Sequence, residues 1–365
     1  MTLSPTLFIY IGRQFLQWFL VVFLIMIAII ILIDAVELLR RSSTKVDATT
    51  TIVTSMALLR APFLAQEAVP FAAMFGGILT YSRLTRNHEL VVIRSAGVSV
   101  WQFLLPALLV VVMIGVTKIT LLNPLSSLLL TQFEELEGEY LTGRSPLLAV
   151  SSSGIWLRQT HGENGRAVIH AESIEPDDVE LQQVIVFLLA EEDQFIGRID
   201  AKTARLSAGR WNFTDAWLTG PEKPGEFVSS HSMTTDLTSD KIQNSFASPE
   251  TVSFWSLPRF IRILEETGFS ALPHRLQFHT LIAEPVLLIA MVMIAAGFSM
   301  RLSRRGGVLL LLGAGILTTF LLFIVTSVVH AIGLGGTVPV VLAAWTPAGV
   351  SLMAGTTLLM HLEDG

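Results

Sequence analysis

The sequence contains no cysteine and little charge, and each absence excludes a class of protein. Without cysteine among its 365 residues, the chain has no disulfide framework, no cysteine-based metal or redox site and no lipoprotein anchor. Only 15% of the residues are charged, whereas soluble domains carry about a quarter. A large part of the chain must therefore face something other than water.

Signatures of catalysis are also missing. The sequence has no G-x-x-x-x-G-K-[ST] phosphate loop, no H-E-x-x-H motif and no G-x-S-x-G motif. His274 and His279 are five residues apart, which is poor spacing for metal ligands and favours an interfacial role. We therefore predict a non-enzymatic protein with no catalytic residue, no metal site, no cofactor of its own and no nucleic-acid partner.

Long apolar runs are the dominant feature of the sequence. A helix needs about 20 mostly apolar residues to cross a bilayer. The first run has 18 uncharged residues and no small-x-small cleavage site after it, which favours a retained helix over a signal peptide. Six spans are predicted: Leu16–Ile33, Ala61–Tyr81, Val100–Leu122, Thr280–Met300, Val308–Ile332 and Val338–Met360.

The basic residues of the short loops predict the orientation, because Lys and Arg are retained on the cytoplasmic side. One side of the predicted spans holds seven such residues: Arg13, Arg83, Arg86, Arg94, Arg301, Arg304 and Arg305. The other side holds three: Arg40, Arg41 and Lys45. Both termini are therefore predicted in the cytoplasm, with the long segment between the third and fourth spans outside.

That long segment, residues 123–277, has the pattern of β structure. Short alternating runs, such as Trp211–Thr214, are separated by Gly, Pro and Asp turns. Further predicted strands are Ala167–Ile174, Leu181–Leu189 and Phe227–Leu237, and Leu257–Thr267 is predicted to be helical. Such spacing predicts a sandwich, jelly roll or open barrel. The predicted domains are helices with a short cytoplasmic helix (1–122), the β domain (123–277) and helices (278–365).

The β segment is acidic, with 22 acidic and 12 basic residues and a net charge of −10. It cannot attract an anionic lipid by bulk charge. A lipid cargo would have to be held through its acyl chains in an apolar groove, at about 25 cal/mol per Å² buried. An open β domain would also offer a free strand edge to another β protein.

The loop between the second and third spans predicts a short helix outside the membrane. Asn87 is a helix-capping residue type, Glu89 suits the first turn, and Gly97 suits the C-terminal stop. The apolar run Leu90–Ile93 wraps much of this helix, so it needs a partner. Two interpretations stay open: the helix lies on the lipid surface, or it couples the chain to a cytoplasmic motor.

A basic cluster follows the first span on the outer side. Arg40, Arg41 and Lys45 lie where loop basic residues are disfavoured. They could anchor the helix at the interface, or they could hold the phosphate of an anionic ligand through guanidinium hydrogen bonds.

Three charged residues lie within predicted spans or at their outer ends: Glu67, Lys118 and Glu284. Such charges face protein or a wet cavity. Glu67 is 14 residues from Tyr81, or about 21 Å along a helix. It could extend to the outer interface or, less readily, serve as a proton relay.

Several motifs are similar to those of one transporter family. Tyr10–Arg13 precedes the first span and Val36–Arg41 follows it. His88–Gly97 is similar to an E-L-(V/A)-(V/A)-x-x-(A/S)-(A/S)-G signature, and Ser253–Pro258 precedes the predicted re-entry helix. Together with the layout of three spans, β domain and three spans, these motifs resemble the lipopolysaccharide export permeases, the LptF/LptG (YjgP/YjgQ) family, and most closely its LptG branch.

The resemblance implies a permease subunit of an ATP-driven ABC transporter in the bacterial inner membrane. Such a subunit extracts lipopolysaccharide and passes it to a periplasmic bridge toward the outer membrane. Its partners would be an LptF-type permease, an LptB-type ATPase dimer that binds ATP and Mg, LptC- and LptA-type β proteins, and membrane lipids. The β domain would be a periplasmic jelly roll.

The resemblance also implies site residues. The ATPase-coupling set would be Arg86, Asn87, His88, Glu89, Leu90, Val91, Val92, Ile93, Arg94 and Gly97. Arg40 and Arg41 match basic positions near the cavity mouth. Where some relatives carry Lys at position 34, this chain has Asp34, so Arg40 and Arg41 would carry more of a phosphate contact.

Two other classes remain as alternatives. An ABC permease of the lipoprotein-release or mechanotransmission type usually has four spans, with its large domain after the first. An ion-coupled transporter could use Glu67, Lys118 or Glu284, although no inverted repeat is visible in the sequence.

Overall fold

The computed structural model describes residues 4–43, 49–142, 148–151, 154–161, 165–175, 180–190, 194–207, 209–221, 224–235, 248–266, 269–302 and 308–363. The chain forms two compact units, a helical unit and a β unit. The helical unit holds residues 1–141, 253–255 and 272–365, and the β unit holds residues 142–252 and 256–271. The division at Leu141 falls later than the residue 122 predicted from the sequence.

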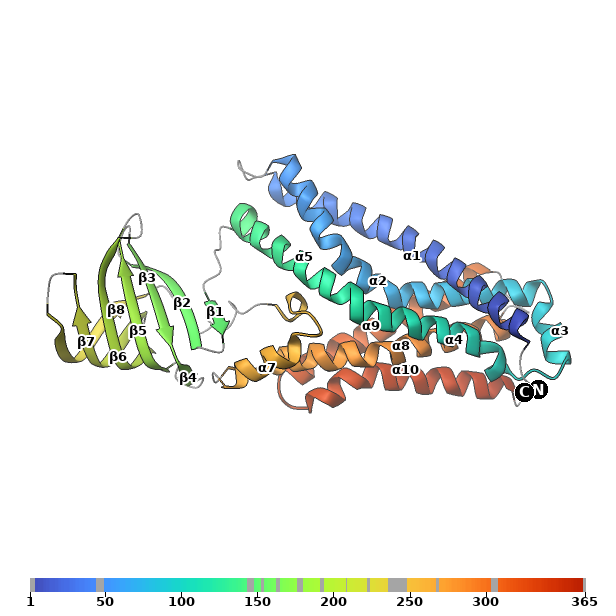
Figure 1. Cartoon of the computed structure of the whole chain (residues 1–365). Helices are drawn as coiled ribbons and strands as arrows, with labels where there is room; N and C mark the ends of the chain where they lie inside the picture. Colours follow the sequence, from blue (N-terminus) through green and yellow to red (C-terminus); the bar gives the residue numbers. More distant parts are fainter. Residues whose placement is uncertain are drawn as a thin grey trace. The chain divides into compact units, whose positions relative to one another are not determined.

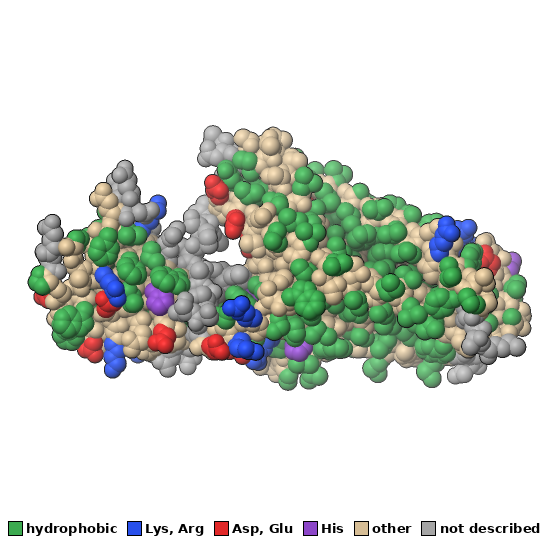
Figure 2. Space-filling model, viewed as in Figure 1, with side chains coloured by type: hydrophobic (Ala, Val, Ile, Leu, Met, Phe, Trp, Pro, Cys, Tyr) green, Lys and Arg blue, Asp and Glu red, His purple; other side chains and the backbone are tan. Residues whose placement is uncertain are grey.

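Six helical segments of the described chain are long and apolar enough to cross a membrane, which confirms the predicted number. They are built from α1 (Pro5–Ser42), α2 (Thr50–Arg86), α4 (Val100–Thr117) with its continuations η1 (Lys118–Leu122) and α5 (Asn123–Leu136), α8 (Leu272–Leu302), α9 (Val308–Leu334) and α10 (Val340–Glu363). Both termini and the short helix α3 (Glu89–Ser95) lie at the same end of this unit (Figure 1). The visible side of the unit is mostly hydrophobic, with charged side chains gathered toward its ends (Figure 2).

The third span is longer than predicted. The π-helix η1 (Lys118–Leu122), α5 (Asn123–Leu136) and η2 (Glu137–Thr142) continue α4, where the sequence placed the start of the β domain. Pro124 stands in the first turn of α5, where a missing backbone N–H costs little. Polar residues of this extension are buried instead of exposed, including Asn123, Ser126 and Ser127.

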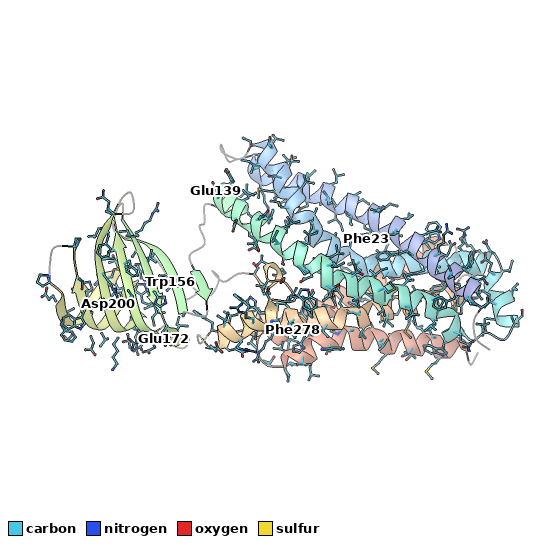
Figure 3. All side chains as sticks on the ribbon, viewed as in Figure 1. Phe23, Glu139, Trp156, Glu172, Asp200 and Phe278 are labelled. Atoms are coloured by element: carbon cyan, nitrogen blue, oxygen red, sulfur yellow. The ribbon has the colours of Figure 1, made fainter. Side chains whose placement is uncertain are left out.

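The returning chain is fastened to this extension. The Asn123 side-chain oxygen accepts a hydrogen bond from the Phe254 backbone N–H at 2.7 Å. The Trp255 indole N–H lies 3.4 Å from the Thr120 carbonyl oxygen, in the π-helical turn. Phe254 stacks on Phe278 of α8, with 5.5 Å between ring centroids. Phe278 is labelled in Figure 3. Residues 253–255 therefore join the third and fourth spans.

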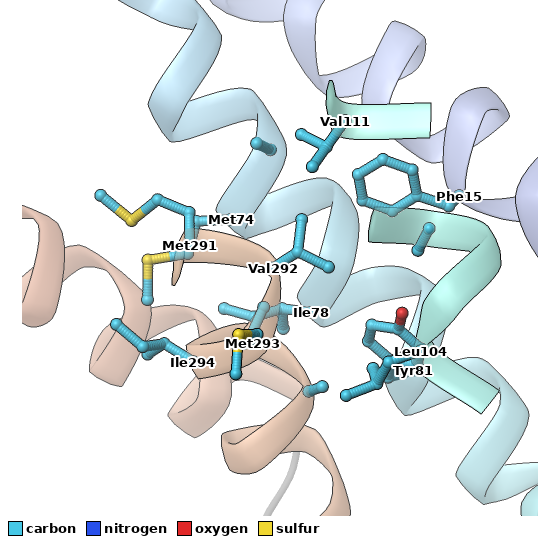
Figure 4. Close-up of a cluster of buried hydrophobic side chains, with 14 of the residues drawn as sticks. Phe15, Met74, Ile78, Tyr81, Leu104, Val111, Met291, Val292, Met293 and Ile294 are labelled. Atoms are coloured by element: carbon cyan, nitrogen blue, oxygen red, sulfur yellow. The ribbon is translucent and has the colours of Figure 1, made fainter. Parts of the chain in front are cut away.

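The core of the helical unit lies between α2, α8, α4 and the first turns of α1. Phe15 of α1, Ile78 and Tyr81 of α2, and Val292 of α8 are almost fully buried there (Figure 4). By contrast, few residues are buried in the most apolar windows of α1 and α9, only 6% and 11%. The central helices are therefore fixed by protein packing, whereas α1 and α9 are left to lipid or to a partner.

Gly76 allows α1 and α2 to approach closely. A Cβ at this position would lie 2.8 Å from the Phe19 Cα and 2.9 Å from the Phe19 backbone nitrogen. Because backbone cannot yield locally, Gly76→Ala is expected to destabilise the unit by about 1–3 kcal/mol. The measurement is thermal unfolding in mild detergent.

Gly349 in α10 provides the matched control. A Cβ added to Gly349 would have no heavy atom of the described residues within 4 Å. Gly349→Ala is therefore expected to be neutral, or to gain up to about 1 kcal/mol from helix propensity. Equal unfolding temperatures for the two alanine variants would contradict the close approach at Gly76.

The β unit is built from one antiparallel sheet. Its strands are β1 (Leu148–Ser151), β2 (Gly154–His161), β3 (Gly165–Ala171), β4 (Ser173–Glu175), β5 (Glu180–Leu189), β6 (Phe195–Ser207), β7 (Arg210–Thr219) and β8 (Glu226–Thr234). The order is β1-β2-β3-β5-β6-β7-β8, and β4 also pairs with β5. Apart from β4, which pairs with β5 and not with β3, successive strands of the chain are neighbours in the sheet. The predicted β structure is confirmed, although the first described strand begins at Leu148 and not near residue 123.

One face of the sheet forms the core of this unit. Trp211 and Phe213 of β7 are fully buried, together with Ile155 of β2 and Ile169 of β3. Helix α7 (Leu257–Glu266) adds Leu264 to the same cluster. On the other face, the Arg205 guanidinium donates two hydrogen bonds to Glu180 across β5 and β6 and holds the pKa of that carboxyl below its usual value.

Candidate functional site

The loop between α2 and α4 forms the predicted short helix, but its cap differs from the prediction. Helix α3 spans Glu89–Ser95, shorter than the predicted nine residues. Its N-cap is His88 in the left-handed conformation, with φ of 62°, because Asn87 is used as the C-cap of α2. The Asn87 amide instead donates to Glu89 at 3.1 Å. Gly97 has φ of +81°, which suits glycine at the end of the helix.

The apolar residues of α3 divide between two faces. Leu90 and Ile93 are buried and belong to the core of the helical unit. Val91 and Val92 are 55% and 67% exposed. Around this exposed pair lie the exposed residues Arg86, Asn87, His88, Arg94 and Gly97. The helix thus has one face fixed to the spans and an apolar face with a polar rim left open.

Hydrogen bonds connect α1 to this loop. The Tyr10 hydroxyl donates to the Glu89 carboxylate at 2.9 Å. With the Gln14 amide oriented to satisfy its neighbours, its oxygen accepts from Arg83 at 3.0 Å and from Trp18 at 2.8 Å. These contacts join α1 to the first residue of α3 and to the last turn of α2.

The basic cluster at the far end of α1 is paired with carboxylates. Arg40 donates two hydrogen bonds of 2.8 Å to Glu37, and Arg41 donates one of 3.0 Å to the same carboxylate. Arg41 also reaches Glu137 of η2 at 3.3 Å. Their side chains remain 74% and 50% exposed. Lys45 lies outside the described residues.

Asp34 is held by Arg60 of α2 in a 2.9 Å hydrogen bond. The Arg60 guanidinium also lies over the Phe133 ring of α5, 5.1 Å from its centroid. This contact joins α1, α2 and α5. Arg60 is thus occupied by Asp34 and Phe133 and is less exposed than its neighbours. Arg40 and Arg41 are the more exposed guanidinium groups among the described residues at this end of α1.

Two of the three charged residues singled out in the sequence form a buried ion pair. Lys118, in the π-helical turn of the third span, donates to Glu284 of α8, and both side chains are nearly inaccessible. The pair joins helices 166 residues apart in sequence. Glu67 contributes a nearby negative charge to Glu284 but is itself exposed.

Several site residues were missed by sequence reasoning. Glu37 stands three and four residues before Arg40 and Arg41, and this helical spacing was a usable signal for pairing. By contrast, the contacts of Tyr10 with Glu89 and of Arg41 with Glu137 join distant segments, so neither pairing could be read from spacing.

Comparison with known proteins decides the family. The family model of the lipopolysaccharide export system permease LptF/LptG matches residues 9–361. The chain belongs to the LptF/LptG family. The expectation drawn from its motifs and from the layout of spans and sheet is thereby confirmed.

Curated members of the family are similar to the chain over most of its length. The lipopolysaccharide export system permease protein LptG of Escherichia coli K12 is 22% identical over 314 residues, covering 83% of this chain and 84% of that protein. LptG of Haemophilus influenzae is 22% identical over 310 residues, covering 81% and 82%. The chain is thus a multi-span membrane permease of the lipopolysaccharide export family.

Proposed function

We propose that this chain is an LptG-type permease subunit of an ATP-driven exporter that extracts lipopolysaccharide from the inner membrane. The observation that carries the proposal is α3, which is fixed to the spans by Leu90 and Ile93 and presents Val91 and Val92 outward. An exposed apolar pair with a polar rim suits a protein partner better than water. That partner would be an LptB-type ATPase dimer, which binds ATP and Mg, while this chain performs no chemistry.

The proposed orientation follows from the loop charges. The end of the helical unit with both termini and α3 faces the cytoplasm, and the β unit faces the periplasm. An LptF-type permease would complete the cavity in the membrane, against the largely uncovered α1 and α9. The outer strands β1 and β8 each pair with one described strand, so their free edges suit the LptC- and LptA-type β proteins.

Arg40 and Arg41 are the proposed contacts for lipid phosphate. Glu37 now accepts hydrogen bonds from both, so a phosphate would compete with that carboxylate for the same donors. Phosphate suits two neighbouring guanidinium groups because it accepts several charge-assisted hydrogen bonds. Both arginines remain exposed enough for a ligand to reach them.

Removing the two arginines and removing their competing carboxylate should change lipopolysaccharide binding in opposite directions. In the purified complex, with a photoreactive residue near the end of α1, Arg40→Glu with Arg41→Glu is expected to reduce crosslinking of lipopolysaccharide by about tenfold, the loss of roughly 1.4 kcal/mol of binding. Glu37→Gln should increase crosslinking, since it removes the competing carboxylate. Equal crosslinking in wild type and both variants would overturn the phosphate role.

A further inference from the structure

Glu67 is unusual among the residues of α2. All residues from Ala61 to Ser82 are described, and Glu67 alone among them is exposed. Its neighbours Gln66 and Ala68 are buried, as is Val69. Between Ala61 and Ser82 the other side chains of α2 are buried or half-buried, so the one exposed position of this stretch carries a carboxylate within a membrane-spanning segment.

The local charges are unbalanced. Lys118 and Glu284 neutralise each other in their buried pair, and Glu67 adds a negative charge that acts on Glu284. No described residue forms an ion pair with Glu67. The nearest arginine along the same helix, Arg60, is already held by Asp34 and lies over Phe133. With both carboxylates ionised, Glu67, Lys118 and Glu284 together carry a net charge of −1. One further cationic side chain would neutralise the group.

Lipid is a poor environment for this side chain. A carboxylate inside a membrane is found facing protein or a wet cavity, because hydrocarbon offers it neither hydrogen bonds nor counter-charge. Its two methylene groups give it little reach, and α2 continues outward from Glu67 to Thr50. The buried Lys118–Glu284 pair nearby shows that α8 and the third span cover α2 on one side at this level, while the side of Glu67 is left open.

We propose that Glu67 pairs with a lysine or arginine side chain of a second membrane-spanning subunit. The pairing would complete the charge balance of Glu67, Lys118 and Glu284 and fix the register of the two subunits across the membrane. It rests on the proposed function, which requires a second permease beside this one. An intersubunit ion pair of this kind contributes specificity, because a wrong partner would leave the carboxylate unpaired.

Crosslinking in the intact complex tests the pairing. A benzophenone amino acid at position 67, in complex purified in mild detergent, should crosslink to the second membrane subunit close to a Lys or Arg. The control position is Met113 of α4, an apolar side chain that is 69% exposed. The crosslinked fraction at position 67 should exceed that at position 113 by about tenfold. Crosslinks from position 67 to lipid alone, or none, would overturn the pairing.

Charge reversal gives a second, independent readout. Glu67→Lys should reduce the recovered two-subunit complex about tenfold, and changing the crosslinked Lys or Arg to Glu should restore it. Undiminished recovery with Glu67→Lys would overturn the pairing. If no second membrane subunit accompanies the wild-type chain, the proposed function fails as well, whereas a second subunit that is insensitive to Glu67→Lys removes only this inference.

Discussion

Replacing Lys118 with methionine is expected to destabilise the helical unit by about 3–5 kcal/mol, because Glu284 would be left as a buried charge without its partner. The ammonium and the carboxylate are both nearly inaccessible, and Glu67 adds further negative charge nearby. Methionine keeps the length and most of the volume of lysine. The effect would therefore report the lost charge and not a cavity. Unfolding in mild detergent measures it.

The double variant Lys118→Met with Glu284→Leu is the matched control. Removing both charges together is expected to recover most of the lost stability, since replacing a buried ion pair with apolar residues is often neutral or stabilising. A double variant that is as unstable as Lys118→Met alone would show that the single change acts through packing. Wild-type stability of Lys118→Met would contradict the ion pair itself.

Charging the exposed face of α3 is expected to abolish export while leaving the fold intact. Val91→Glu with Val92→Glu places two carboxylates on the surface proposed to bind the ATPase, and neither side chain belongs to the core of the helical unit. Burying two unpaired charges in an interface costs several kcal/mol, so the ATPase should be lost from the purified complex. Glu89→Ala should weaken the same association less, because the carboxylate lies at the edge of that face.

The control for this experiment is Leu128→Glu, a comparable change at an exposed leucine of α5. It should leave the ATPase bound. Normal amounts of ATPase with Val91→Glu and Val92→Glu, together with normal export, would contradict the coupling role of α3. In that case the lipid-surface interpretation of this helix would be favoured.

Features set by local pattern could be predicted from the sequence. The six spans could be predicted from the length of the apolar runs, because a helix needs about 20 apolar residues to cross a bilayer. Alternation gave strands near Trp211–Thr214 and Leu181–Leu189, which lie in β7 and β5. The stop at Gly97 followed from the one residue type that adopts positive φ without cost.

Features set by contacts between distant residues could not be predicted. The third span continues through Asn123 because its polar residues find buried partners, such as the Phe254 backbone, that no local pattern shows. Asn87 is a good N-capping residue type, but it is the C-cap of α2. His88 is therefore the N-cap of α3. The pairing of Lys118 with Glu284 depends on the packing of α8 against the third span.

The charged residues of the outer cluster show the same division. Pairing of Glu37 with Arg40 and Arg41 lies within one helical turn and could have been anticipated. The contact of Arg41 with Glu137 and that of Asp34 with Arg60 required the three-dimensional arrangement of α1, α2 and η2. Arg40 and Arg41, which stand out in the sequence as a basic cluster, form ion pairs with Glu37 and Glu137 in the fold.

The most direct test of the central claim is to identify the proteins that copurify with the chain in mild detergent. We expect a small cytoplasmic ATPase, present in two copies, and a second permease with three spans on each side of a β domain. The ATPase should be lost with Val91→Glu and Val92→Glu, while the second permease is retained. A homodimer of this chain without an ATPase would contradict the proposed function and favour an ion-coupled transporter.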